Sequence, residues 1–375
     1  MADSIDKSVT DTKTTVEIPG AEEIIQDQQE KIEKVQSDGG PVEIEMDDQG
    51  GAEISFDPNA VTPEGGEEHF SNLAEFLDDG LLTELATTLS DKYTSYKESR
   101  ADWEDSYREG LDLLGFKYQR RTQPFRGASS VTHPVLAEAV AQFQATAYKE
   151  LLPADGPVRS QILGAVTPAK QDQANRVKDF MNYQLMDQMK EYEPEFDQML
   201  FYLPLAGSTF KKVYYDDLLG RAVSKFVHSD DLVVPYSATS LEDAEAVVHV
   251  IKMSENELRK QQVSGFYKDI DLGEPPVVEN QLTEKKQELE GITQNGQEDM
   301  YTLLEFHIDL DLEGYEDVNP EDGEPTGIKV PYIVTVDTAN TEILSIRRNY
   351  QAEDPLKKKI NYFVQFKFLP GTGFY

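Results

Sequence analysis

The spacing of large apolar residues changes near residue 208 and divides the chain into two patterns. Between residues 70 and 200 these positions recur every three or four residues, the period of helices that bury one side. From residue 208 they alternate with polar residues, the period of strands with one buried face. Before residue 70 they are sparse. The pattern predicts an α+β protein: a helical N-terminal half (69–207) packed with an antiparallel strand-rich part (208–375), preceded by an arm (1–68).

Three helical segments are expected in the first pattern. Residues 70–116 predict two or three short helices, with Ser71 and Ser90 as N-caps and breaks at Asp79-Gly80 and Gly110. The segment "THPVLAEAVAQFQATAYKELLP" predicts a helix that ends at Pro153. A third block covers residues 169–199. Its apolar stripe is expected to be plain core and consists of Val177, Phe180, Met181, Leu185 and Met189.

The second pattern predicts an antiparallel meander. "STFKKVYYD", "RAVSKFVHSDDLVVPY" and "AEAVVHVIKM" read as strands, and Ser254 with Glu257 three residues later predicts the start of a short helix. Residues 269–300 are polar and are expected to form an exposed insertion. Strands resume with "YTLLEFHIDLDLE", "IKVPYIVTVDT", "EILSIRRNY" and "INYFVQFKF".

Charge adds a constraint on partners. The net charge is −36, and residues 1–100 hold 25 acidic and 7 basic residues, half of that charge on about a quarter of the chain. With so little apolar surface to bury, the arm is expected to be disordered. General acidity argues against tight binding of duplex DNA, which needs Lys and Arg on phosphates, but it allows DNA to slide past. Solubility of a large assembly explains the charge equally well.

Composition and motifs predict no catalytic, cofactor or metal site. There is no cysteine, and no apolar run approaches the roughly 20 residues that span a bilayer, so no membrane contact is expected. The five histidines are scattered in sequence, and no phosphate-binding loop is present.

Two acidic arrangements resemble metal sites. Asp309, Asp311, Glu313 and Gly314 follow the start of a calcium loop, but Pro320 stands where that loop needs a glutamate. Asp309 and Asp311 could also join other acids around magnesium, as in a nuclease. The acids in question are Asp216, Asp217 and Asp230. A solvated acidic strand end is the simpler interpretation of both.

One basic cluster interrupts the acidic chain. "FKYQRRTQPFRGASS" contains Lys117, Arg120, Arg121 and Arg126 and no acidic residue. Contact with DNA is one hypothesis. Contact with the acidic surface of a neighbouring subunit is the other, and the charge of every copy favours it.

Four long segments resemble one family. They are "GFKYQRRTQPFRGASSVTHPVLAEAVAQFQATAYKELLPADGPVRSQILG", "LPLAGSTFKKVYYD", "DDLVVPYSATSLEDAEAVVHVIKMSENELRKQQVSGFY" and "KFLPGTGFY". They are similar to the portal, or head-to-tail connector, proteins of tailed bacteriophages, especially the large portals of short-tailed phages. The resemblance covers about residues 70–375 and leaves out the acidic arm.

The resemblance implies a structural, non-enzymatic protein of the virion. Portal subunits form a ring, typically of about twelve copies, at one capsid vertex. The ring is the conduit for genome packaging by a terminase and for DNA ejection, so it contacts double-stranded DNA transiently. Capsid, scaffolding and tail adaptor proteins are its other partners. Assembly in the host cytoplasm is expected. The residues here resemble the outer part of the subunit, the wing.

The end of the chain departs from the family pattern. In such portals a turn like "LPGTGFY" leads into the stem, clip and crown, which are absent here, so the chain is expected to be part of a longer protein. Two alternatives of other classes stay open: a divalent-metal-dependent nucleic-acid enzyme, and a capsid adaptor or scaffold protein.

Overall fold

The computed structural model describes residues 43–46, 52–55, 69–114, 125, 127, 133–216, 219–273, 300–318 and 324–369. The chain divides into two compact units, Met1–Ser71 and Asn72–Tyr375. In the first unit, β1 (Glu43–Met46) pairs with β2 (Ala52–Ser55) in antiparallel register. This pair lies within the acidic arm, whose disorder stays a prediction. The rest of the arm lies outside the described residues.

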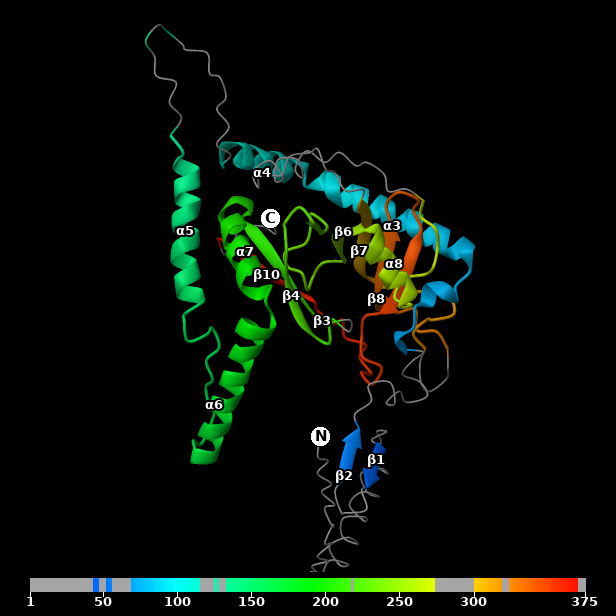
Figure 1. Cartoon of the computed structure of the whole chain (residues 1–375). Helices are drawn as coiled ribbons and strands as arrows, with labels where there is room; N and C mark the ends of the chain where they lie inside the picture. Colours follow the sequence, from blue (N-terminus) through cyan, green and yellow to red (C-terminus); the bar gives the residue numbers. More distant parts are fainter. Residues whose placement is uncertain are drawn as a thin grey trace, which may run out of the picture. The chain divides into compact units, whose positions relative to one another are not determined.

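The second unit is a mixed α+β structure with antiparallel sheets (Figure 1). Its helices are η1 (Leu73–Glu75), α3 (Asp79–Ser99), α4 (Ala101–Leu114), α5 (Val135–Leu151), α6 (Pro168–Tyr183), the π-helix η2 (Gln184–Gln188), α7 (Tyr192–Ala206) and α8 (Glu255–Val263). The α8 start is confirmed: the Ser254 hydroxyl and the Glu257 side chain form a reciprocal capping box.

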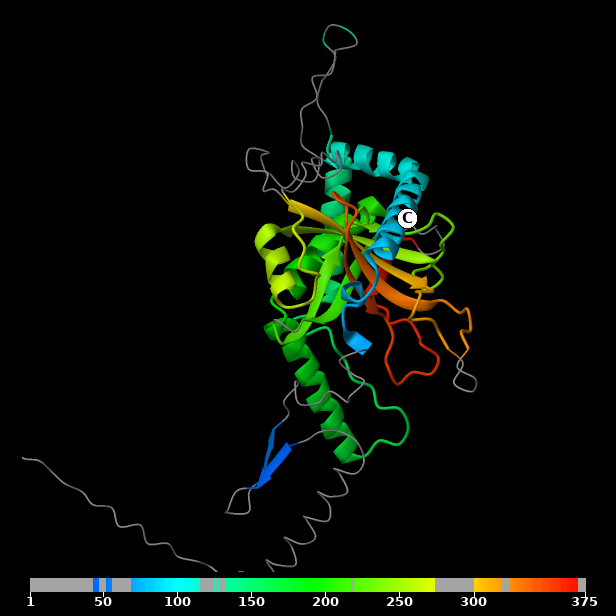
Figure 2. The same cartoon turned by 90° about the vertical axis from the view of Figure 1, so that its right-hand side faces the viewer.

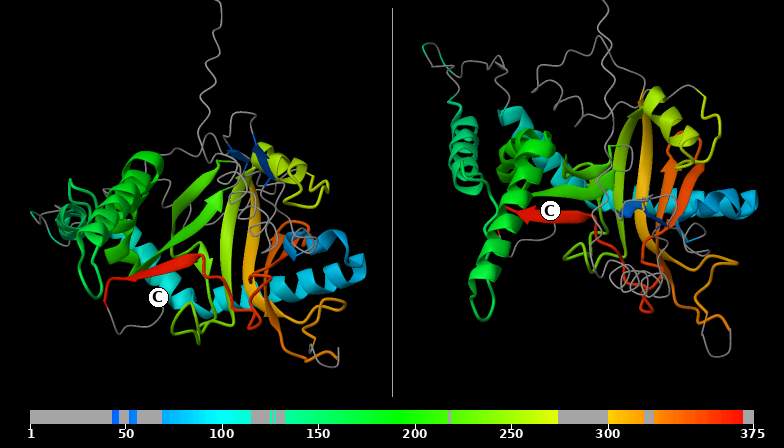
Figure 3. Two further views of the ribbon diagram at one scale, coloured as in Figure 1. Left: turned by 90° about the horizontal axis from the view of Figure 1, so that it is seen from below. Right: turned by 60° about the horizontal axis from the view of Figure 1, so that its bottom comes forward.

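The strands form two sheets rather than one meander. The larger sheet has the order β5 (Leu232–Val233), β6 (Ala246–Ser254), β7 (Met300–Leu310), β8 (Val330–Asp337), β9 (Ile343–Arg348). The smaller has the order β10 (Phe363–Lys367), β3 (Ser208–Asp216), β4 (Arg221–Val227). The chain therefore changes sheets between β4 and β5, and β10 returns to pair with β3, as Figure 3 shows. Alternation predicted the strands but not which strands pair.

The predicted helix caps in residues 70–116 are wrong. Asn72 and Asp78 cap η1 and α3, and the Asp78 carboxylate accepts a hydrogen bond from the Gly80 amide, which places that glycine in the first turn. Ser90 lies in the middle of α3. Gly110 is inside α4, where an added Cβ would lie 4.0 Å from the Leu205 side chain of α7. Aspartate is the better cap here because it satisfies a first-turn amide at the true helix start.

Helices cover both faces of the larger sheet. Leu82 and Leu89 of α3 pack with Leu304 and Phe306 of β7 in the largest core cluster. On the opposite face Leu303 packs with α8 and with residues that follow it, namely Leu258, Tyr267, Ile270 and Leu272. Buried Leu272 and partly buried Ile270 therefore pack on this core, although the sequence placed them in the exposed insertion. Residues 274–299 lie outside the described part.

Buried Arg100, at the junction of α3 and α4, holds the point where the chain changes sheets. Its guanidinium donates hydrogen bonds to the carbonyls of Ser229, Asp230 and Leu232, at 3.0, 2.6 and 2.9 Å. Its Nε also donates to the Glu104 carboxylate at 2.8 Å. One buried cation thus donates to three backbone carbonyls at the start of β5 and in the turn before it.

The apolar stripe of the third helical block is not core. The block is divided at residues 189–191 into α6 with η2 and a separate α7. No residue of α6 is buried, and Val177, Phe180 and Met181 are 49%, 58% and 44% exposed. Figures 1 and 2 show α6 extending away from both sheets. Helical spacing predicted the helix correctly, but it cannot tell a face that meets a core from a face that meets solvent.

The loop that follows α5 is hydrogen-bonded to the C-terminal end of α6. The Asn182 side chain accepts a hydrogen bond from the Val158 amide at 2.9 Å and donates to the carbonyls of Asp155 and Val158. Gly156, at φ +88, lies against it, and an added Cβ would come within 2.5 Å of the Asn182 side chain. Only glycine fits both the conformation and the space.

Candidate functional site

The four basic residues singled out in the sequence lie outside the described residues. Lys117, Arg120, Arg121 and Arg126 follow α4, and of their segment only Phe125 and Gly127 are described. Phe125 is 69% exposed. Whether this cluster contacts DNA or a neighbouring subunit stays a prediction.

The acidic residues weighed as metal ligands are not brought together. Asp309 and Asp311 are exposed at the end of β7, and the Asp216 carboxylate accepts a hydrogen bond from the Leu219 amide. Asp230 is buried in the loop that Arg100 holds. Asp217 lies outside the described part of the chain. Among the residues that are described, no group of three or more His, Asp or Glu side chains could hold a metal ion.

Two of the scattered histidines meet in a cluster that sequence reasoning missed. In the β6–β7 register His249 is opposite Glu305 and Val247 is opposite His307, which places the three polar side chains on one face of the larger sheet. That face meets the smaller sheet, where Lys212 of β3 projects toward it. We call Lys212, His249, Glu305 and His307 the buried polar cluster.

The Glu305 carboxylate is the centre of the cluster. The Lys212 ammonium donates to its two oxygens at 2.6 and 2.7 Å. The Nε2 atom of His307 lies 2.8 Å from Oε1, while Nδ1 of His249 lies 3.8 Å away, too far for a direct hydrogen bond. The ring of Phe363, from β10, stands edge-on to both imidazoles, at 5.5 and 5.1 Å. The cluster therefore joins strands of both sheets.

Burial and charge set the protonation states. Burial alone would raise the pKa of Glu305, but the Lys212 charge and the two histidines hold this pKa well below its ordinary value. Burial lowers the pKa of His249 and that of His307, because an imidazolium is poorly solvated there. At neutral pH the cluster is one lysine–glutamate ion pair with two neutral imidazoles.

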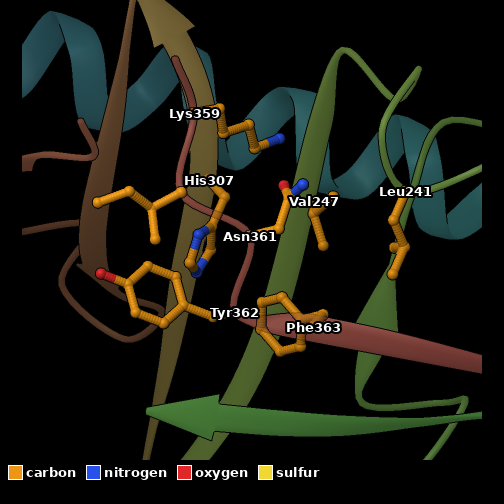
Figure 4. A pocket seen from close by; sticks show the side chains of 8 residues that line it. Leu241, Val247, His307, Lys359, Asn361, Tyr362 and Phe363 are labelled. Carbon is orange, nitrogen blue, oxygen red and sulfur yellow. The ribbon is translucent and has the colours of Figure 1, made fainter. Parts of the chain in front are cut away.

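A small pocket opens beside His307. Its volume of about 10 Å³ is room for about one water molecule. Figure 4 shows the side chains that line it, which are Leu241, Val247, His307, Lys359, Ile360, Asn361, Tyr362 and Phe363. The Lys212 ammonium already occupies the position on Glu305 that a cation or a substrate proton donor would take. The geometry therefore fits a joint between the two sheets better than a site for a bound substrate.

The neighbouring lysine is buried on the other face of β3. Lys211 is 4% exposed, and its ammonium lies 4.2 Å from the centre of the Tyr192 ring and 5.2 Å from that of Phe196, both on α7. Burial lowers the pKa of Lys211 to about 8, partly offset by the charge of Glu195. The two lysines of "STFKKVYYD" thus lie in two different interfaces. The strand pattern had suggested only one buried face.

Comparison with known proteins adds no assignment. No protein-family model matches the chain, and no curated protein is detectably similar to it. In the described part of the chain no helix is long and apolar enough to cross a membrane.

Proposed function

We propose that the chain is a portal subunit, a structural protein that assembles in a ring at one vertex of a phage capsid. Residues 69–375 would form the wing, the outer part of the subunit. The proposal starts from the four sequence segments that resemble portal proteins. The mixed α+β structure with antiparallel sheets is compatible with it.

The exposed apolar face of α6 carries the proposal. A sixteen-residue helix with no buried residue has little reason to be stable in water, because most helix stability in proteins comes from a packed face. A subunit that works only beside its neighbours can leave such a face to be covered in the assembly. A ring of copies supplies that cover, whereas a monomeric adaptor or enzyme does not.

The charge supports the role of a conduit. A surface with net charge −36 repels phosphate, so DNA driven through the ring by a terminase would not be retained. Capsid, scaffolding and tail adaptor proteins remain the proposed protein partners, and the virion the proposed location.

Electron microscopy of the purified full-length gene product tests this function. We expect closed rings with an axial hole, at a mass that is a whole multiple of the mass of that product. Particles that stay monomeric at every concentration, or open aggregates without an axial hole, would contradict a portal.

The alternative enzyme has its own test. Incubation of the protein with duplex DNA and magnesium, compared with the Asp309→Asn, Asp311→Asn double variant, should give no cleavage in either case. Cleavage by the natural chain that the double variant lacks would replace the portal with a nuclease.

A further inference from the structure

The charges of α6 are sorted around its exposed apolar stripe of Val177, Phe180 and Met181. At about 100° per residue, Lys170 lies within about 20° of Val177, and Arg176 and Lys178 flank it at about 100° on either side. The two aspartates of the helix point away from the stripe, at about 140° and 160° from Val177. They are Asp172 and Asp179. The exposed face is therefore apolar with a basic border, on a chain with net charge −36.

Helix α4 carries the complementary face. It contains five acidic residues and one basic residue, and its buried side packs through Tyr107, Leu111 and Leu114. Exposed carboxylates recur at intervals of three, four and three residues on its outer side, which aligns them along one face. These are Asp102, Asp105, Glu109 and Asp112. Leu113, 61% exposed, borders them and supplies an apolar contact.

The two faces have similar lengths. At 1.5 Å per residue, the basic border from Lys170 to Lys178 extends about 12 Å, and the acidic row from Asp102 to Asp112 about 15 Å. Two helices laid side by side could thus bring the cations of α6 against the carboxylates of α4 while the apolar stripe is covered. Within each helix one exposed ion pair, Arg108 with Asp105 and Lys178 with Asp179, would then be shared with the partner.

Their positions prevent one copy from satisfying itself. Figures 1 and 2 show α4 and α6 at opposite ends of the helical part, in both views. Two different surfaces that complement each other but lie apart on one molecule produce head-to-tail contacts, which close into rings or extend as filaments.

We propose that the apolar and basic face of α6 docks on the acidic face of α4 in the next copy of the chain. This inference rests on the proposed function, because it names the contact by which the ring would close. The apolar stripe favours a protein partner over DNA, since a DNA-binding face needs cations where α6 has Val177 and Phe180.

Reciprocal charge reversal tests the contact. Variant A carries Lys170→Glu and Arg176→Glu on α6, and variant B carries Asp105→Lys and Glu109→Lys on α4. In A both faces carry net negative charge, and in B two lysines stand where the basic α6 needs carboxylates and leave the α4 row without net charge, so each alone should need at least tenfold more protein to assemble. An equimolar mixture should assemble like the natural chain, because contacts between A and B place the reversed positions of α6 against those of α4. Mass photometry of the full chains measures both effects.

A matched control uses the far side of the same helix. Asp172→Lys with Asp179→Lys makes charge changes of equal size away from the stripe, and it should leave assembly unchanged. Recovery in the mixture also shows that A and B are folded. If A and B each assemble as well as the natural chain, the contact is wrong even where the rings themselves are seen.

The remaining outcomes separate the contact from the function. Alternating A–B assemblies without closed rings in micrographs would support the contact and contradict the portal. If A assembles normally but no longer retains duplex DNA that the natural chain retains, the α6 face binds nucleic acid and the proposal is overturned. If neither the natural chain nor the mixture assembles, both proposals fail.

Discussion

At the scale of single residues, the Arg100 side chain fixes the segment that connects the two sheets. Its position among Lys and Ser residues at the end of a helix gives no sign in the sequence that it is 2% exposed. The three carbonyls that it satisfies belong to residues about 130 positions away. Sequence periodicity carries no information about such a contact, so only the folded chain reveals it.

We predict that Arg100→Lys destabilises the protein by about 3 kcal/mol or more. Lysine cannot donate in three directions from one plane, so buried carbonyls lose their partners. Urea unfolding followed by circular dichroism measures the change. Arg108→Lys, on the exposed side of α4 where the arginine pairs with Asp105, is the control and should cost under about 1 kcal/mol. Equal effects of the two changes would refute this role of Arg100.

The buried polar cluster predicts that acid destabilises the fold. Unfolded histidines take up protons near pH 6.5, whereas His249 and His307, with lowered pKa values, resist protonation in the folded state. Stability should therefore fall as the pH drops below about 6.5. Glu305, whose folded pKa is well below 4.5, adds stability above pH 4.5 that is lost on further acidification. Besides Lys212 within it, the other titratable groups facing the cluster are Lys359 and Tyr362.

Thermal unfolding between pH 5 and 8 checks this dependence. In His249→Gln the midpoint of thermal unfolding should depend less on pH below 6.5, because one desolvated imidazole has been removed. His133→Gln, exposed at the start of α5, should keep the profile of the natural chain. A natural chain that is as stable at pH 5 as at pH 8 would show that the cluster does not behave as described.

At the scale of elements, the edge of the larger sheet is closed by a side chain. The Asn72 amide donates to the Leu344 carbonyl and accepts from the Ile346 amide, both at 3.0 Å. It therefore imitates a further strand beside β9, and it caps η1 as well by accepting from the Ala74 amide. A protected edge is less available for pairing with another chain.

Asn72→Ala should cost about 2 kcal/mol or more, since two buried backbone groups of β9 lose their partners. Hydrogen exchange at Ile346 should speed up in the same variant. Asn72→Asp keeps the acceptor and loses the donor, so its stability should lie between that of the natural chain and that of Asn72→Ala. Asn256→Ala, exposed in α8, provides the comparison. Unchanged exchange at Ile346 in Asn72→Ala would show that the amide does not protect this edge.

Individual helices and strands were also what the sequence predicted best. The range "STFKKVYYD" is β3 residue for residue, and the α8 cap at Ser254 is confirmed, because both depend on neighbours in the sequence. The buried polar cluster was missed because it depends on register. "VVHV" and "LEFHID" each place polar residues on the apolar face of a strand, and this is a sign of a buried polar group. Nothing in either segment, however, shows that the two strands pair with each other. The prediction that the α6 stripe is core was wrong for the same reason, because its burial depends on residues that are distant in the sequence.

At the scale of the whole molecule, the division into two units predicts independence. Removal of residues 1–68 takes away most of the first unit, Met1–Ser71, and keeps Asn72 with its contacts. We expect the midpoint of thermal unfolding of the shortened chain to stay within about 3 °C of that of the full chain. Calorimetry measures it. A much lower midpoint would mean that the acidic arm takes part in the fold of the second unit.

The joint between α6 and α7 has a consequence for the size of any ring. A π-turn ends α6 at Gln184–Gln188, and beside it Glu191 is held by Arg221 of β4 through paired contacts of 2.6 and 2.9 Å. Copy number in a closed ring is fixed by the angle through which each copy turns the next, about 30° for twelve. If α6 makes the proposed contact, that angle would depend on how α6 leaves the body of the subunit. Arg221→Lys, which loses the paired geometry, should therefore broaden the distribution of copy numbers rather than abolish closure, and particle counting would show it.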